Sequence, residues 1–260
     1  MSYRELAPPS HWSGSIECVW TSSRSIESAA AHTVLPDGAM DVIAEIDDDG
    51  DVQQLFAVGA MTKPFVATLS TARLVGIRFF PGVGGSALQT QAATLTDVTI
   101  PLGDVVLRLD AVRDAFRLLA ISANDAGAFA RLSNALSLGP RSTPSLIRAA
   151  TRAIAQSPHI ARIADLSKEL GASRQHLARQ FATHVGLTPK QFARICRVRA
   201  LLHQSRRNHR GWSEAAASFG YSDQSHLISD VRNVTGLTPG EWGRETGSIL
   251  PIAPVPTSRD

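Results

Sequence analysis

Two stretches of the chain, about fifty residues apart, combine arginine, glutamine and serine in nearly the same order. The first reads GASRQHLARQFATHVGLTPKQF over residues 171–192, and the second reads GYSDQSHLISDVRNVTGLTPGEW over residues 220–242. Arginine pairs bidentately with guanine and glutamine with adenine, so a helix that exposes both can read base edges in the major groove of DNA. The chemistry that these residue types favour is recognition of a nucleic acid.

Each stretch has the pattern of a helix-turn-helix unit, in which a Gly-containing turn joins a short helix to a second, capped helix. Leu177, Phe181 and Val185 recur every four residues and predict the buried stripe of that second helix. Ser173 and Ser222 are the predicted N-caps of the two such helices. The residues predicted to contact DNA are Arg174, Gln175, Ala178 and Arg179 in the first copy and Ser222, Asp223, Gln224, Ser225, Ser229 and Arg232 in the second.

Caps of this kind also occur in helical bundles that bind no nucleic acid, and the charge distribution helps to separate the two interpretations. Residues 1–140 hold nine Lys and Arg against fifteen Asp and Glu, a balance of −6. Residues 141–247 hold sixteen Lys and Arg against seven Asp and Glu, a balance of +9. A basic half favours a polyanionic partner. Two units on that half predict helices in successive major grooves of double-stranded DNA, about 34 Å apart.

The elements that position these helices divide the chain into parts. Residues 1–137 begin with short β-rich runs separated by turn formers, which predict a small β-barrel or sandwich. Two helices follow within 104–136, with Asp104 and Asn124 as N-caps. A linker at 138–144 precedes an all-α region at 145–247, and a flexible tail occupies 248–260. The predicted fold class is α+β with two domains.

The C-terminal hundred residues resemble the DNA-binding domain of AraC-family transcription regulators. The resemblance is carried by IADLSKELGASRQHLARQF, by TPKQFARICRVRALL and above all by GYSDQSHLISDVRNVTGLTPGEW. It implies a monomeric DNA-binding domain of seven helices with two helix-turn-helix units. The family pattern places base readers at Gln175, Ala178 and Arg179 in the first unit and at Gln224, Ser225 and Ser229 in the second.

Ser229 departs from that pattern, because many relatives carry arginine there. Serine is too short for a bidentate pair with guanine, and each such pair contributes about 1–3 kcal/mol of discrimination. We therefore expect the first unit to dominate sequence readout. The second unit would mainly position the domain through phosphate contacts from Arg232 and from the helix N-terminus near Ser222.

The N-terminal half resembles the small β domain of one AraC-family branch, through YRELAPP, LPDGAMDVI, VGAMTKPF and GIRFFPGVGGSAL. Such a domain senses a small molecule or makes a homodimer. The residues singled out for effector binding are Trp20, His32, Asp41 and Arg78. An ion pair between Arg78 and a surface carboxylate is the simpler alternative for that side chain, and Asp37 with Gly38 is more simply a turn. The helices within 104–136 could dimerise or cover one end of the β domain.

Other classes of function have little support in the sequence. It holds no P-loop, dinucleotide fingerprint or nucleophile elbow, so we expect neither an enzyme nor a cofactor. Cys18 and Cys196 lack metal-ligand spacing and are expected to be free thiols in a reducing cytoplasm. No apolar run reaches the roughly 20 residues that span a membrane. The expected function is ligand-responsive transcription regulation with RNA polymerase as a partner; the alternatives are an effector-independent regulator whose β domain only dimerises, and a β-domain enzyme fused to a DNA-binding module.

Overall fold

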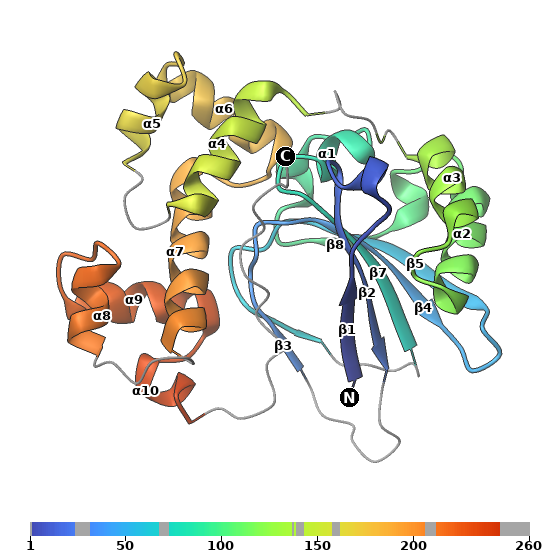
Figure 1. Ribbon diagram of the computed structural model, residues 1–260, viewed down its shortest axis with the longest axis horizontal. Coiled ribbons are helices and arrows are strands. Elements are labelled where there is room, and N and C mark those ends of the chain that lie inside the picture. The colour runs from blue at the N-terminus through green and yellow to red at the C-terminus, as the bar shows by residue number, and fades with distance from the viewer. Residues whose placement is uncertain are drawn as a thin grey trace.

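The computed structural model describes residues 2–23, 32–67, 73–136, 138, 143–157, 162–205 and 212–244. It has an N-terminal part built on a β-sheet and a C-terminal part built of helices, which lie side by side (Figure 1). The prediction of an α+β chain with two domains is confirmed. The linker predicted at 138–144 lies largely outside the described residues, and the tail at 248–260 lies wholly outside them, so the domain limits stay predictions.

The N-terminal part is organised around a six-stranded antiparallel sheet, with the order β1-β2-β7-β4-β5-β8. No pairing among the described residues joins the edge strands β1 and β8, so the sheet is open, whereas a closed barrel would join them. A separate two-stranded ribbon pairs β3 with β6. The strands are β1 Ser2–Leu6, β2 Ile16–Ser23, β3 His32–Val34, β4 Asp41–Ile46, β5 Val52–Val58, β6 Phe65–Ala67, β7 Arg73–Phe79 and β8 Thr99–Pro101.

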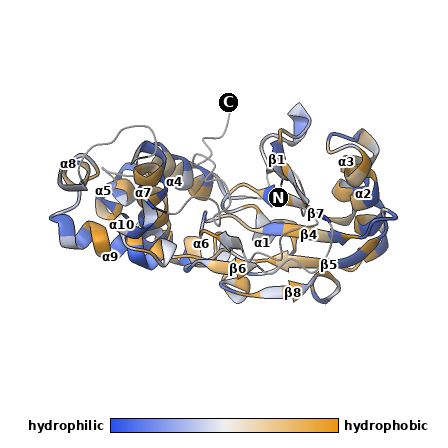
Figure 2. Ribbon diagram, turned by 90° about the horizontal axis from the view of Figure 1, so that it is seen from below, coloured by the Kyte–Doolittle hydropathy of each residue, from blue (hydrophilic) through white to orange (hydrophobic). Residues whose placement is uncertain are grey.

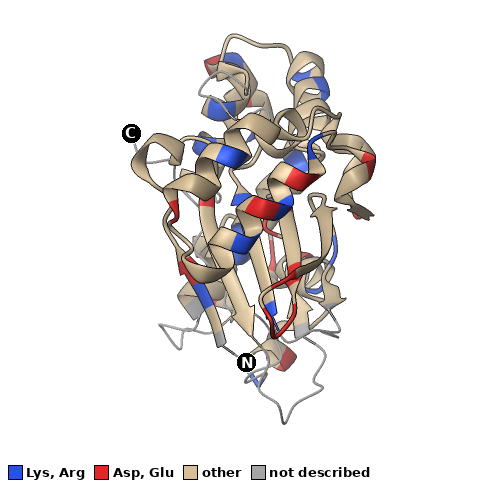
Figure 3. Cartoon of the chain, turned by 90° about the vertical axis from the view of Figure 1, so that its right-hand side faces the viewer, with Lys and Arg blue, Asp and Glu red and all other residues tan. Residues whose placement is uncertain are grey.

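Two helices, α2 Leu109–Ile121 and α3 Ala126–Ala135, cover one face of the sheet. The apolar side of α2, including Phe116 and Leu119, is fully buried, while its outer side carries charges of both signs (Figure 3). Arg73 Nη2 of β7 donates to the Ala120 carbonyl at 2.5 Å and ties the helix to the sheet. Of the two roles considered for these helices, the structure supports covering the β domain.

The N-caps predicted for these two helices are wrong. Asp104 belongs to a short 3₁₀ helix, η3 Leu102–Asp104, and α2 begins five residues later, at Leu109. Asn124 precedes the cap of α3, which is Asp125; its side chain accepts a hydrogen bond from the Ala128 amide at 2.8 Å. Asn124 and Asp125 are adjacent residues of the same capping type, whereas α2 begins after Arg108 without a side-chain cap.

Seven helices make up the C-terminal part as far as the structure describes it, in agreement with the predicted number. Apolar residues lie along the strands and on parts of the helices (Figure 2). None of the described helices is both long and apolar enough to cross a bilayer. The seven are α4 Ser145–Gln156, α5 Ile163–Glu169, α6 Arg174–His184, α7 Pro189–Ser205, α8 Trp212–Ser218, α9 Gln224–Thr235 and α10 Pro239–Trp242.

Two short elements, α1 Gly84–Ala87 and η2 Ala92–Leu95, connect the sheet with the helical part, whereas η1 Ser10–Trp12 packs through Trp12 against Phe129 of α3. Both α1 and η2 contact α6. Thr143, just before α4, donates its hydroxyl to the Gly82 carbonyl at 3.0 Å and is buried. The core therefore runs without interruption from the sheet into the helical part.

Candidate nucleic-acid interface

The two candidate reading helices are α6 and α9, and each begins at a side-chain cap. Ser173 Oγ accepts a hydrogen bond from the His176 amide at 3.1 Å. Asp223 Oδ1 accepts from the His226 amide at 2.8 Å. The prediction that Ser222 caps the second helix is therefore wrong: its hydroxyl donates to Asp223 Oδ2 at 3.0 Å instead.

The corrected cap sets the alignment of the two copies. Ser173 and Asp223 are fifty residues apart, as are His176 and His226, Leu177 and Leu227, and Gly186 and Gly236. Gly171 and Gly220, which precede the helices, are only forty-nine apart, so the second turn holds one extra residue. The counterparts of Arg174, Gln175, Ala178 and Arg179 are thus Gln224, Ser225, Ile228 and Ser229.

This alignment sharpens the difference between the copies. The resemblance had matched Gln175 with Gln224, but the position that corresponds to Gln175 holds Ser225. Ser229 does correspond to Arg179, as expected. In the first copy Arg179 Nη2 lies 3.1 Å from His176 Nδ1, a contact that orients the guanidinium along the helix surface. The second copy has only the short side chains of Ser225 and Ser229 at the positions that correspond to Gln175 and Arg179.

Nine of the ten residues predicted to contact DNA are exposed, and the tenth, Ala178, is half-buried. The apolar sides of the same helices, with Leu177 and Phe181 in α6 and Leu227 and Val231 in α9, are fully buried. The β domain covers neither reading face. Contact of these residues with DNA stays a prediction, and their exposure is what such contact requires.

The helix α7 joins the two units and packs against both. Phe192 of α7 lies against Phe181 of α6, with ring centroids 6.0 Å apart. Arg194 Nε lies 3.0 Å from Asp230 Oδ1 of α9, and the Asp230 side chain is buried. The guanidinium of Arg197 sits 5.3 Å from the centroid of the Tyr221 ring, just before α9. One helix therefore supports both helix-turn-helix units.

The N-terminus of α9 carries its own anion. Hydrogen bonds from the His226 amide and the Ser222 hydroxyl lower the pKa of Asp223, so this carboxyl is ionised at neutral pH. It accepts from an amide that a DNA phosphate would otherwise use. The phosphate contact that the sequence predicts at this helix N-terminus is thus less favourable than expected, and the contact predicted for Arg232 is unaffected by this carboxylate.

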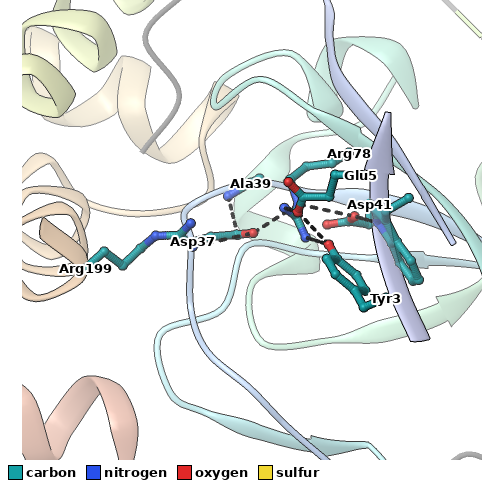
Figure 4. A network of polar contacts seen from close by, with 8 residues as sticks. Tyr3, Glu5, Asp37, Ala39, Asp41, Arg78 and Arg199 are labelled. Atoms are coloured by element: carbon teal, nitrogen blue, oxygen red, sulfur yellow. Dashed lines mark hydrogen bonds and ion pairs between the residues drawn. The ribbon is translucent and has the colours of Figure 1, made fainter. Parts of the chain in front are cut away.

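A second polar cluster lies on the sheet, where Asp41 and Arg78 come together (Figure 4). The Trp20 indole donates to Asp41 Oδ1 at 2.7 Å, and Arg78 Nε lies 3.6 Å from the same oxygen. Arg78 also lies 3.0 Å from Glu5 Oε1 and 3.2 Å from Asp37 Oδ2. Of the four residues singled out for effector binding, three are therefore neighbours. His32 begins β3, and its side chain is outside the described residues.

The expected ion pair of Arg78 is present, but it is not a surface pair, because only 13% of the side chain is exposed. Asp37 makes the expected turn, since its Oδ1 accepts a hydrogen bond from the Ala39 amide at 2.9 Å. Its other oxygen, Oδ2, pairs with Arg78. Burial raises the pKa of Asp41 to about 6, although Arg78 opposes the shift. Burial likewise raises the pKa of nearby Glu17 to about 8.

Sequence reasoning did not single out Glu5, Glu17 and Tyr3 as members of this cluster. Alternation along β1 could have indicated that Tyr3 and Glu5 share a face, but the pairing of β1 with β2 and of β2 with β7 was needed to bring that face to Trp20 and Arg78. Glu17 lies at the register irregularity between Ile16 and Cys18, which alternation does not predict. In the part of the chain that the structure describes, no group of three or more His, Cys, Asp or Glu could hold a metal ion. Cys18 and Cys196 are both free and buried, as expected.

Comparison with known families agrees with this architecture. Residues 166–245 match the family described as a helix-turn-helix domain, and residues 4–101 match the family described as a domain of unknown function, DUF6597. The chain therefore carries an AraC-type helix-turn-helix domain at its C-terminus and a DUF6597 domain at its N-terminus. A helix-turn-helix domain of this kind supports DNA-binding transcription regulation.

Among solved structures, the chain is similar to ToxT from Vibrio cholerae, with 12% identity, 95% of this chain and 100% of that chain covered, and a TM-score of 0.43. It is also similar to an apo variant of ToxT from Vibrio cholerae strain SCE256, with 10% identity, 86% and 96% coverage, and a TM-score of 0.45. No curated protein matches the chain.

Proposed function

We propose that this chain binds specific DNA sequences, with α6 and α9 in successive major grooves of one duplex. The observation that carries the proposal is the pair of helices with equivalent caps, both held on α7 and both with their predicted reading faces exposed. The basic balance of residues 141–247 supports it, because phosphate contacts supply much of the affinity for DNA.

The two helices contribute unequally to readout. Arg179 and Gln175 can pair bidentately with bases, whereas their counterparts Ser229 and Ser225 cannot. The second helix would then act chiefly through Arg232 and other phosphate contacts, which fix the register of the protein on DNA without reading sequence. Specificity accordingly resides mainly in one half of the bound site.

Binding curves test this division of labour. Selection from a random pool of duplexes gives a preferred site, and fluorescence anisotropy then compares that site with a scrambled one for Arg179→Ala and Ser225→Ala. Arg179→Ala should lose about 5- to 150-fold in discrimination, the equivalent of about 1–3 kcal/mol. Equal losses in the two variants would contradict the ranking. Affinity that does not fall with added salt would contradict DNA binding itself.

For the β domain we propose a sensory role in the cytoplasm, with DNA affinity modulated by a small molecule and RNA polymerase as the downstream partner. The cluster of Trp20, Asp41 and Arg78 supports this role, because a few convergent polar groups beside aromatic rings are typical of ligand sites. The ring of Tyr3 lies 6.0 Å from that of Trp20 and extends the aromatic surface.

A thermal-shift screen of metabolites on the full chain tests the sensory role, since a ligand that binds only the folded state raises the melting temperature. The shift should be lost in Trp20→Ala. A homodimer without an effector is the alternative, and light scattering at tens of micromolar protein distinguishes it. Because the apolar residues of α2 are largely turned to the sheet, that dimer would have to use another surface.

A further inference from the structure

Besides the contacts of Gly82 with Thr143 and of α1 with α6, the β domain contacts the helical part at three further places, and two of them are equivalent positions of the repeat. Gly186 follows the first reading helix and Gly236 follows the second, fifty residues later. Both have positive φ, of 83° and 77°. The third contact is at the middle of the connection, on α7. Figure 1 shows α7 between the two units with the β domain beside it.

At the first unit, the contact is a hydrogen bond. The Thr96 hydroxyl, at the end of η2, donates to the Gly186 carbonyl at 2.5 Å. The approach of the two backbones is close, because a Cβ on Gly186 would lie 2.9 Å from the Ala92 carbonyl oxygen. The turn that ends α6 is thus fixed directly to the β domain.

At the second unit, the contact is apolar. Pro64, which precedes β6, reaches the turn that ends α9, and a Cβ on Gly236 would lie 3.4 Å from Pro64 Cγ. That distance is ordinary van der Waals contact. Pro64 therefore lies close to the turn of the second unit, at the position equivalent to the one where η2 contacts the first.

On α7, the contact combines packing with charge. A Cβ on Gly38 would lie 2.5 Å from the Phe192 ring, so only glycine fits at this turn. Beside it, Asp37 Oδ2 lies 3.8 Å from Arg199 Nη1 of α7 and 3.2 Å from Arg78 Nε of the sheet (Figure 4). Arg199 is only 5% exposed. One carboxylate oxygen thus faces a buried arginine from each domain.

We propose that the β domain acts as a splint, meaning that it is fixed to both helix-turn-helix units at once. In this way it determines which separation between the two halves of a DNA site the protein accepts. The inference rests on the proposed binding of α6 and α9 to one duplex. Without the splint, the second unit is held by its packing on α7, and the first unit by its packing on α7 and on α4. With it, each unit is also fixed at the turn that ends its reading helix, so the two helices keep one separation and one relative rotation.

Half-site spacing tests the splint in the full chain. One inserted base pair moves the second half-site by about 3.4 Å and turns it by about 34°. Duplexes carry the sequence selected by the wild-type protein, at its own spacing and with one base pair inserted or removed. A separate duplex carries only the half-site of α6. Affinities are measured by fluorescence anisotropy at one fixed salt concentration.

The test variant is Thr96→Val with Asp37→Asn, which removes the hydroxyl donor and the shared charge while keeping side-chain size. The matched control is Thr94→Val with Asp51→Asn. Thr94 lies in the same 3₁₀ helix and donates its hydroxyl to Gln91 within that segment, and Asp51 pairs with Arg117 on the surface. Thermal denaturation verifies that both proteins are folded.

The wild-type and control proteins should lose about tenfold or more in affinity when the spacing changes by one base pair. The test variant should lose about threefold or less, with affinity for the single half-site unchanged within about twofold. If the folded test variant loses as much affinity as the wild-type protein when the spacing changes, the splint is overturned. If that variant does not fold, the same affinities are measured for Pro64→Ala, which removes only the contact at the second unit. The loss of affinity on a change of spacing is then compared with that of the wild-type protein in the same way. Selection of no preferred sequence by the wild-type protein would instead contradict the proposed function.

Discussion

Ser173 and Asp223 cap the two reading helices in the same way, fifty residues apart. Each side chain accepts a hydrogen bond from the backbone amide three residues later, on His176 and His226 respectively. The shared geometry shows that the two copies correspond from the cap onward. It also shows that the extra residue of the second copy lies in the turn before the cap, where the Ser222 hydroxyl lies 3.2 Å from His226 Nδ1 of the helix.

The first prediction concerns the second cap. Asp223→Ala should lower the free energy of unfolding by more than Ser222→Ala does, because it leaves an amide at the start of α9 without its acceptor. Ser222→Ala removes a hydroxyl that only supports the cap and should cost less than about 0.5 kcal/mol. Urea denaturation followed by circular dichroism measures both. A larger loss of stability in Ser222→Ala than in Asp223→Ala would show that Ser222 is the cap.

Ser229 gives a prediction of gained specificity. Ser229→Arg places a guanidinium at the position that corresponds to Arg179, from which a bidentate pair with guanine is in reach. Discrimination at one base pair of the second half-site should rise by about 1–3 kcal/mol. Asn233→Arg adds the same charge at another exposed position of α9 and should raise affinity without a new base preference. Selection from a random pool by the two variants compares them.

A third prediction concerns the counter-charge of the cluster on the sheet. Arg78→Met leaves Glu5, Asp37 and Asp41 together without their shared cation, and it should destabilise the protein by about 3–5 kcal/mol at pH 7.5. The loss should shrink at pH 5, because protonation relieves the repulsion among the carboxylates. Thermal denaturation at the two pH values measures both effects.

The control for that variant is Arg117→Met. Arg117 also pairs with two carboxylates, Asp51 and Asp114, but its side chain is 44% exposed. Exposed ion pairs contribute about 1 kcal/mol or less, so this variant should be nearly as stable as the wild-type protein. A comparable loss in the two variants would mean that Arg78 is no more important than a surface arginine.

Glu17 gives a prediction of pH dependence. Burial raises its pKa from 4.5 to about 8, so the folded protein retains a proton that the unfolded chain releases. Folding stability should therefore fall as the pH rises from about 4.5 to 8. Glu17→Gln cannot ionise, so it should match the wild-type protein at pH 5 and exceed its stability by about 1–3 kcal/mol at pH 8. Glu169→Gln, at an exposed position of α5, controls for the lost charge. Identical pH profiles of Glu17→Gln and the wild-type protein would refute the assignment.

Local signals account for what could be predicted of the reading helices. The cap Ser173 was identified from the residues that follow it, and its side chain accepts the expected hydrogen bond. The number of helices is the one that the resemblance to the AraC-family domain implied. Ser222 was mistaken for a cap because serine and aspartate are adjacent there and both are good caps.

The cluster around Arg78 could be predicted only in part. Trp20, Asp41 and Arg78 were singled out as polar or aromatic residues within β-rich runs, but their proximity depends on the pairing of β7 with both β2 and β4. Such pairing joins residues far apart in the chain, and no short-range pattern records it. The role of α2 and α3 was left open for the same reason.

By itself, the sequence determined the two reading helices, because a helix, its cap and its exposed face depend on residues within a few positions of one another. Only the tertiary structure decided where Asp37 and Thr96 lie. The sequence assigned Asp37 to a turn, and that is correct, but the same carboxylate also faces Arg199 on α7, more than 150 residues further along the chain. Contacts of this range form when the two domains pack, and they place the β domain against both turns that follow the reading helices.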